Sequence, residues 1–276
     1  MPEKETAAPR AGAAAPLDLV GSGWRLGRDM IVAPRRAAER LLNDPEALPA
    51  ALVIYLAYLA VSVAFYSWKP ADFPSVSDAP LALRSPLPQG PVFWAKVQAW
   101  SPALTAIWIY FLAWFVERLK TGRLAFWLFV SALVWVAPTV GLVLWASKQI
   151  PTLALGLVWL VALAPTVPLV RAKEPGSWAP LGALLLAIVA VNLALCPLFA
   201  VTVLIHSDKG YEGLEMVMLF WTLGLGTYLL SRIERLSAAR AFAALFFSMI
   251  AQMAAVFSLH AGGLVSKEIL KALMSI

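Results

Sequence analysis

Seven long apolar stretches alternate with polar joints along this chain, and almost all of its charged residues lie in the joints. A helix that crosses a bilayer needs about 20 largely apolar residues. The pattern therefore predicts an all-α fold, a polytopic transmembrane helical bundle. The seven predicted spans are 47–68, 97–116, 124–147, 151–170, 180–205, 214–231 and 241–260.

The second and sixth of these stretches are interrupted. Gln98 and Ser101 shorten the second, and Glu215 with two glycines weakens the sixth. Each of the two is interpreted either as a full span or as a half-span or interfacial helix.

Lysine and arginine alternate from joint to joint, which predicts how the bundle is oriented. Cytoplasmic flanks of membrane helices are enriched in these residues. The N-terminal region holds seven, and the second, fourth and sixth joints hold three, two and three, or 15 of the 22 in the chain. We therefore predict an integral membrane protein with the N-terminus inside and the C-terminus outside.

Composition excludes a soluble domain. Hydrophobic residues make up 61% of the chain and charged residues 14%, against about 45–50% and about 25% in soluble proteins. The net charge of +6 is interpreted as a topology and lipid-headgroup signal. We expect membrane lipids as partners and no nucleic acid, and leave open a membrane-protein partner or self-association.

The ends of the chain differ from its middle. Residues 1–23 are polar and lack the apolar region of a signal peptide, which predicts a disordered cytoplasmic tail. In residues 24–46, one side holds Leu26, Met30, Ala37, Leu41 and Leu42, with arginines around them and a break at Pro34. We therefore expect an interfacial amphipathic segment; a solvated helix is the alternative. The tail from Ser266 is expected to be a short amphipathic helix on the outer leaflet. The predicted membrane-surface contacts are Trp24, Arg28, Arg35, Arg36 and Arg40.

No span carries an ionisable residue near its middle. Such residues usually mark ion pathways and intramembrane enzymes. His206 and His260 are too few for a closed metal site, and Cys196 has no partner cysteine. We therefore expect no enzyme, no catalytic residue, no metal and no cofactor.

Small residues recur every three or four positions in the last span and form one helical stripe. That face is expected to meet another helix closely, in this chain or in a second copy. The stripe comprises Ala241, Ala244, Ser248, Ala251, Ala255, Ser258 and Gly262.

Prolines interrupt three successive spans, and broken membrane helices often border a cavity. Tryptophans and a few amides lie at similar depths, either in such a cavity or in helix packing. The candidate cavity or packing residues are Trp108, Trp135, Pro138, Trp159, Pro165, Asn192, Pro197 and Gln252.

Residues Pro34 to Pro45 read Pro-Arg-Arg-Ala-Ala-Glu-Arg-Leu-Leu-Asn-Asp-Pro, and Gly122, Phe126 and Ser131 precede an Ala137-Pro138 pair. With this pattern the chain resembles the bacterial branch of the Yip1-like membrane protein family. The resemblance implies a bacterial inner membrane, a cytoplasmic N-terminus and a five-span core at 47–206, with 207–276 as an appended two-span hairpin. Eukaryotic members are associated with vesicle trafficking and prenylated small GTPases; their DLYGP segment is absent here.

Two functions fit these features. The first is a non-enzymatic scaffold that organises a partner or the bilayer through the N-terminal segment and the small-residue stripe. The alternative is a transporter or lipid-handling protein with a cavity at the proline-broken third to fifth spans.

Overall fold

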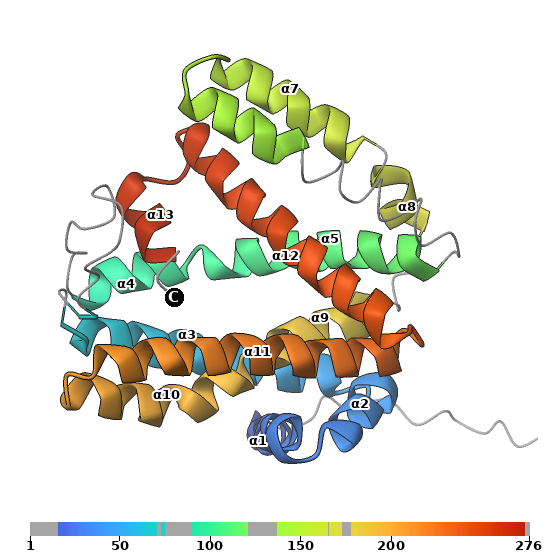
Figure 1. Ribbon diagram of the computed structural model, residues 1–276. Helices are drawn as coiled ribbons and strands as arrows, with labels where there is room; N and C mark the ends of the chain where they lie inside the picture. Colours follow the sequence, from blue (N-terminus) through green and yellow to red (C-terminus); the bar gives the residue numbers. More distant parts are fainter. Residues whose placement is uncertain are drawn as a thin grey trace, which may run out of the picture.

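A computed structural model describes residues 16–70, 73–74, 90–120, 137–164, 166–172 and 178–273, and all regular structure in these residues is helical (Figure 1). An unlabelled helix, Ala137–Ala146, precedes α7. The labelled helices are α1 (Pro16–Val32), α2 (Pro34–Asn43), α3 (Ala47–Trp68), α4 (Pro91–Gln98), α5 (Ser101–Lys120), α7 (Thr152–Leu163), α8 (Val167–Ala172), α9 (Trp178–Ala187), α10 (Ala190–Leu204), α11 (Asp208–Ile233), α12 (Ala238–Ala261) and α13 (Lys267–Leu273).

Five helical stretches in the described residues are long and apolar enough to cross a membrane. They are α3, α4 with α5, α9 with α10, α11 and α12. The predicted all-α, multi-pass membrane architecture is confirmed at this level. The sixth predicted span is a helix of 26 residues that begins at Asp208, earlier than expected, because the Ser207 hydroxyl accepts a hydrogen bond from the Gly210 amide and caps it.

The described parts of the third and fourth predicted spans are helices too short to cross a membrane alone. Residues 124–136 lie outside the described residues, and the remaining helix, Ala137–Ala146, is shorter than a span. The fourth is divided into α7 and α8, and α7 has 12 residues. The sequence places Pro165 and Pro168 around this break, and proline both lacks the amide hydrogen and clashes with the preceding helical turn.

The long helices share one hydrophobic core. In Figure 1, α3, α10 and α11 run side by side, and α12 crosses α5 diagonally. Core residues of α5, α9, α11 and α12 belong to the same cluster. A Cβ on Gly226 of α11 would lie 2.7 Å from a Leu245 methyl and 2.9 Å from one of Ile188, so only glycine allows this approach without a shift. The predicted C-terminal hairpin is thus packed into the bundle.

The helix α1 begins at Pro16, so residues 16–23, expected as part of a disordered tail, are helical. Gly23 and Gly27 lie one turn apart and allow α1 to approach α3 closely. A Cβ on Gly23 would lie 3.1 Å from Val53 and 3.2 Å from the Ala50 carbonyl oxygen. Small residues at this spacing are a common packing device of membrane helices, and this signal was missed.

The expected break at Pro34 separates α1 from α2. Leu26, Met30 and Leu41 are buried, and α1 packs on α3 and α10. Leu42, expected on the same side, is exposed. The apolar face of this segment therefore contacts the protein itself.

The C-terminal helix also packs on the bundle. The Ser266 hydroxyl accepts a hydrogen bond from the Ile269 amide at 3.3 Å, as a helix cap does. Leu270 is buried in a cluster with Leu104 and Val256. Its apolar side covers α4, α5 and α12. The position of this helix at the outer leaflet stays a prediction.

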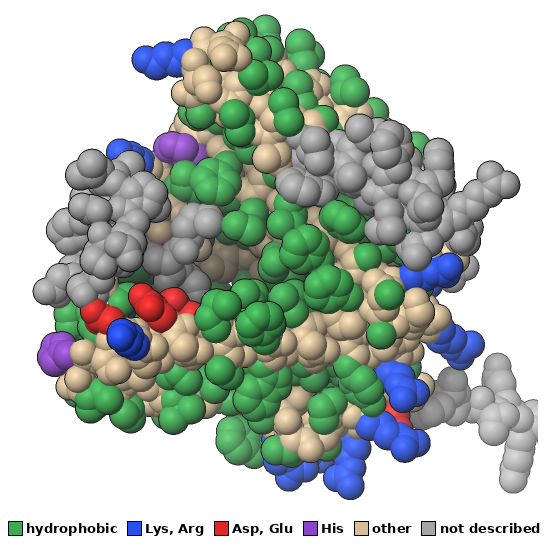
Figure 2. All heavy atoms as spheres, viewed as in Figure 1, with side chains coloured by type: hydrophobic (Ala, Val, Ile, Leu, Met, Phe, Trp, Pro, Cys, Tyr) green, Lys and Arg blue, Asp and Glu red, His purple; other side chains and the backbone are tan. Residues whose placement is uncertain are grey.

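The two ends of the bundle carry different charges. Lys120 at the end of α5 forms ion pairs with Glu117 and with Glu234, which follows α11. Figure 2 shows lysines and arginines gathered at this end, whereas carboxylates lie over the beginning of α11 at the other. The second and sixth joints therefore lie together, as the alternation of charge requires.

Candidate functional site: a polar seam between α3, α10 and α11

Polar side chains follow one face of α3 through the bundle. Tyr55, Tyr58, Ser62, Tyr66 and Lys69 are spaced by three or four residues, so they form a single helical stripe. Lys69 caps the helix at its C-terminal end. This stripe faces α10 and α11, as the residues around the cavities described next show.

The neighbouring helices supply matching positions. Tyr211, Glu215 and Thr222 lie four and seven residues apart on α11, and Asn192 and Cys196 lie four apart on α10. Residues of all three helices line two adjoining cavities. We call this region, from Tyr55 to Lys69 of α3 with its partners on α10 and α11, the polar seam.

The outer cavity, which lies nearer the C-terminal end of α3, has a volume of about 50 Å³. A water molecule needs about 10–15 Å³ by this type of measure, so there is room for a few waters or a small polar group. Tyr66 of α3 and Tyr211 of α11 both line it. It is lined by Tyr58, Val61, Ser62, Phe65, Tyr66, Asn192, Leu193, Cys196, Phe199, Tyr211, Glu215 and Met218.

Lys69 borders the outer end of this cavity. Its ammonium donates a hydrogen bond to the Phe73 carbonyl at 2.6 Å and lies 5.4 Å and 5.8 Å from the ring centres of Tyr211 and Tyr66. Both distances fall within the range of cation–π interactions. Burial lowers the pKa of Lys69, and the nearby Glu215 carboxylate partly opposes this effect.

The central cavity has a volume of about 240 Å³ and adjoins the outer one, since Tyr58 and Asn192 line both. Figure 2 shows a hollow between α11 and α12, the two helices that contribute Thr222 and Gln252. The Tyr55 hydroxyl is hydrogen-bonded to Thr105 at 3.0 Å. The remaining lining residues are Ser101, Leu104, Trp108, Leu185, Ile188, Val189 and Leu273.

Thr222 is the least satisfied group of the central cavity. Its hydroxyl oxygen is buried and has no hydrogen-bond partner among the described residues. Buried hydroxyls are nearly always paired, and an unpaired one calls for a water or ligand. The central cavity therefore offers a polar partner to a bound molecule.

A third concavity, which we call the apolar groove, has mostly apolar walls. It lies between α5, α7 and α12 and has a volume of about 560 Å³. The Trp159 indole donates a hydrogen bond to the Ser258 hydroxyl at its wall. The other walls are aliphatic or aromatic: Ala106, Ile107, Tyr110, Phe111, Leu163, Ala255, Leu259 and Leu264.

The predicted cavity residues are distributed over these places. Trp108, Asn192 and Gln252 line the central cavity, whereas Trp159 lines the apolar groove. Trp108 donates to the Ser248 hydroxyl at 3.0 Å, and the Gln252 amide donates to the Leu104 carbonyl at 3.1 Å.

The proline positions form no common site. Pro138 is buried in the helix Ala137–Ala146, and Pro197 is exposed on α10. Trp135 and Pro165 lie outside the described residues. The outer and central cavities are bordered mainly by α3, α5, α10, α11 and α12. A cavity at the proline-broken third to fifth spans stays a prediction.

The small-residue stripe is the inward face of α12. Ala241, Ala244, Ser248 and Ala251 are fully buried, and α5 is the main partner of the helix. Ala255 and Ser258 are half-buried, and Gly262 is exposed at the end.

The predicted surface contacts share the side of α1 and α2 that faces away from the bundle. Trp24, Arg35 and Arg36 are exposed, Arg28 is largely exposed and Arg40 is partly covered. Arg35 pairs with Glu39 on the same helix. Arg28 and Arg40 instead share the carboxylate of Asp29, which is 1% exposed.

Sequence reasoning missed most of the polar seam. The signal was present, because hydroxyl side chains at 55, 58, 62 and 66 repeat with the period of a helix. The tyrosines and the serine were overlooked because charged residues were taken as the sign of a functional site. Among the described residues there is also no group of three or more histidines, cysteines or carboxylates that could hold a metal ion.

No protein-family model, curated protein or solved structure matches this chain. The Yip1-like resemblance and its five-span core therefore stay predictions.

Proposed function

We propose that this multi-pass membrane protein is a lipid-handling protein that binds an amphipathic molecule of the lipid class in the polar seam. The buried hydroxyl of Thr222 carries the proposal, since Thr222 lines the central cavity and this hydroxyl has no partner in the described structure. Binding sites for small molecules are mostly apolar concavities with a few convergent polar groups. The central cavity has this character: Tyr58, Asn192 and Thr222 lie among leucines, isoleucine and valine.

The packing of two other features supports lipid handling over a scaffold. A scaffold would use the apolar face of the N-terminal segment and the small-residue stripe of α12 to contact a partner. Leu26 and Met30 of the first, and Ala244 and Ala251 of the second, are buried within this chain. Neither face is available to a second protein without opening the bundle.

We propose in addition that the chain has seven spans, with its N-terminus inside and its C-terminus outside, in a bacterial inner membrane. The helix Ala137–Ala146 with the preceding residues, and α7 with α8, would supply the third and fourth spans. The ion pair of Lys120 with Glu234 supports a common inner side for the second and sixth joints. Accessibility of single cysteines placed at Ser237 and Ser207 to an impermeant thiol reagent, in a chain with Cys196→Ala, tests the orientation.

A photoreactive lipid tests the binding proposal. The full chain, in membranes that contain a phospholipid with a diazirine in its acyl chain, should yield labelled peptides from α3, α10 and α11. The double variant Asn192→Leu with Thr222→Leu should lose this labelling. A matched control is Met216→Leu, which changes an exposed, lipid-facing position of α11. Equal labelling of the double variant and the control would contradict the proposal.

A further inference from the structure

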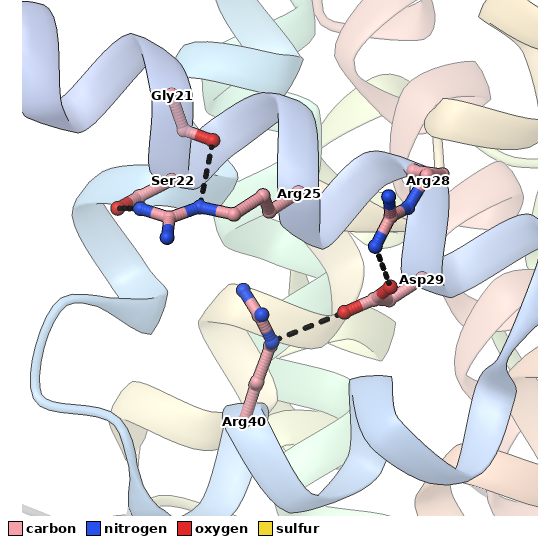
Figure 3. Close-up of polar contacts among 6 residues, drawn as sticks. All are labelled: Gly21, Ser22, Arg25, Arg28, Asp29 and Arg40. Atoms are coloured by element: carbon pink, nitrogen blue, oxygen red, sulfur yellow. Dashed lines mark hydrogen bonds and ion pairs between the residues drawn. The ribbon is translucent and has the colours of Figure 1, made fainter.

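Three arginines gather where α1 and α2 face each other. Figure 3 shows Arg25 and Arg28 on α1 and Arg40 reaching towards them from α2, with the Asp29 carboxylate between Arg28 and Arg40. Asp29 Oδ1 lies 3.3 Å from Arg28 Nη2, and Oδ2 lies 3.1 Å from Arg40 Nε. One buried carboxylate therefore holds a guanidinium from each helix.

Arg25 is held separately. Its Nε donates to the Gly21 carbonyl and its Nη2 to the Ser22 hydroxyl, both at 3.2 Å. Ser22 in turn donates to Glu46 at 3.5 Å, which is the second carboxylate near the cluster. Three guanidiniums thus face two carboxylates, and one of the carboxylates is almost fully buried beneath them.

The cluster keeps hydrogen-bond donors for an outside partner. A guanidinium has five N–H donors in a planar fork, and Asp29 forms one ion-pair contact with each of Arg28 and Arg40. The side chain of Arg28 is 55% exposed and that of Arg40 35%. Planar forks of this kind match phosphate oxygens, often with two hydrogen bonds at a time.

The surroundings place the cluster at the level of lipid headgroups. Gly23, two residues before Arg25 in the sequence, lies against the first two turns of α3 at Ala50 and Val53. Trp24 is 76% exposed, and Val20 and Val32 are exposed on the same helix. Exposed tryptophan and aliphatic side chains among arginines are typical of a helix in the membrane interface.

We propose that Arg25, Arg28 and Arg40 form a binding site for the phosphate of an anionic lipid headgroup, with Asp29 as the residue that positions Arg28 and Arg40. This site is separate from the polar seam and does not depend on it. It differs from general attraction of a basic surface, because Arg35 and Arg36 lie outside the cluster although they carry the same charge.

Binding of a fluorescent phosphatidic acid to the full chain in detergent tests the site. Arg25→Gln and Arg40→Gln should each weaken binding by about tenfold, and Arg40→Lys should restore it only in part because the planar fork is lost. Arg35→Gln is the matched control and should bind as the parent does. Equal losses for all arginine variants, or none, would overturn the proposal.

Asp29→Asn separates positioning from charge. The substitution removes one negative charge, so general electrostatics predicts tighter binding of an anion. If Asp29 positions the two guanidiniums, binding becomes weaker instead. Thermal unfolding of the same sample shows whether the chain remains folded, and Asp29→Glu provides a second variant that keeps the charge. Tighter binding of Asp29→Asn would overturn the positioning role.

Competition identifies the source of the phosphate. Fluorescent phosphatidylcholine, whose headgroup has no net charge, should bind at least about tenfold more weakly than phosphatidic acid. Inorganic phosphate should not displace the lipid at concentrations where unlabelled phosphatidic acid does. Displacement by both at the same concentration would mean a site for soluble phosphate, and the lipid assignment would be wrong.

Discussion

The α5–α12 interface and the polar seam use the same helical spacing with opposite results. On α12, positions three and four apart hold alanine or serine, and the helix lies close against α5 with Trp108 bonded to Ser248. On α3, the same spacing holds tyrosines, and two cavities remain between it and α10 and α11. Spacing alone therefore predicts which face is buried. The size and polarity of the side chains decide whether that face packs closely against its neighbour or leaves a cavity.

The two regions are also expected to differ in their roles, the α5–α12 interface in stability and the polar seam in binding. In the first interface, polar groups find partners within the protein: Ser248 accepts from Trp108, and Gln252 donates to a carbonyl. In the seam, the Thr222 hydroxyl has none in the described residues. Substitutions at the first interface should change stability, and substitutions at the second should change binding.

The largest effect is expected from a bulky residue in the α12 stripe. Ala244 is fully buried, so Ala244→Phe would force α12 away from its neighbours and lower the free energy of unfolding by about 3 kcal/mol. Thermal unfolding in detergent measures this. Ala239→Phe, at an exposed position of the same helix, should have little effect. If the two variants lose stability equally, the stripe is not the close contact.

A smaller effect is expected from two glycines of α11. In Gly226→Ala the new methyl would meet Leu245 and Ile188, whereas Gly224→Ala meets nothing within 4 Å. Alanine favours a helix over glycine by about 0.8–1.0 kcal/mol, so Gly224→Ala should be stabilising. Gly226→Ala should be less stable than Gly224→Ala by about 1–2 kcal/mol, because the methyl must displace its neighbours. Similar unfolding temperatures for the two would contradict the close packing at Gly226.

Loss of one hydroxyl at the tight interface should cost less again. Ser248→Ala leaves the Trp108 indole N–H without its acceptor. Hydrogen bonds between membrane helices contribute about 0.6 kcal/mol on average, so the unfolding free energy should fall by that amount. A double-mutant cycle with Trp108→Phe isolates the pair. A coupling energy of zero would show that the bond adds nothing.

The smallest change in stability is expected in the seam. Thr222→Val removes a buried hydroxyl that has no described partner and keeps the shape of the side chain. Stability should stay the same or rise slightly, because no hydrogen bond is lost and a buried polar group is removed. Labelling by the photoreactive lipid should decrease. A clear loss of stability would mean that this hydroxyl already has a structural role.

Five helices long and apolar enough to span a membrane, and their buried faces, could be predicted from the sequence because they follow from the length and periodicity of its apolar and small residues. The stripe from Ala241 to Ala251 and the buried position of Leu26 and Met30 are examples. The partners of these faces could not be predicted. Nothing in the sequence of α1 says that Gly23 meets Val53, since that contact depends on how distant helices cross.

The candidate site was predicted less well, for a physical reason. Charged groups and proline breaks are conspicuous in a sequence because they are costly within a membrane helix. Tyrosine, threonine and asparagine cost less there and repeat without a recognisable motif. Their convergence from α3, α10 and α11 becomes visible only when the three helices are packed together.

Cys196, the one cysteine of the chain, lines the outer cavity and reports directly on the seam. The rate at which N-ethylmaleimide alkylates it should be measured in delipidated full chain and after a total membrane lipid extract is added back. Occupation of the seam predicts that the extract slows alkylation by about tenfold and that Thr222→Leu with Asn192→Leu abolishes this protection. Equal rates with and without the extract in the parent chain would contradict a lipid-binding seam.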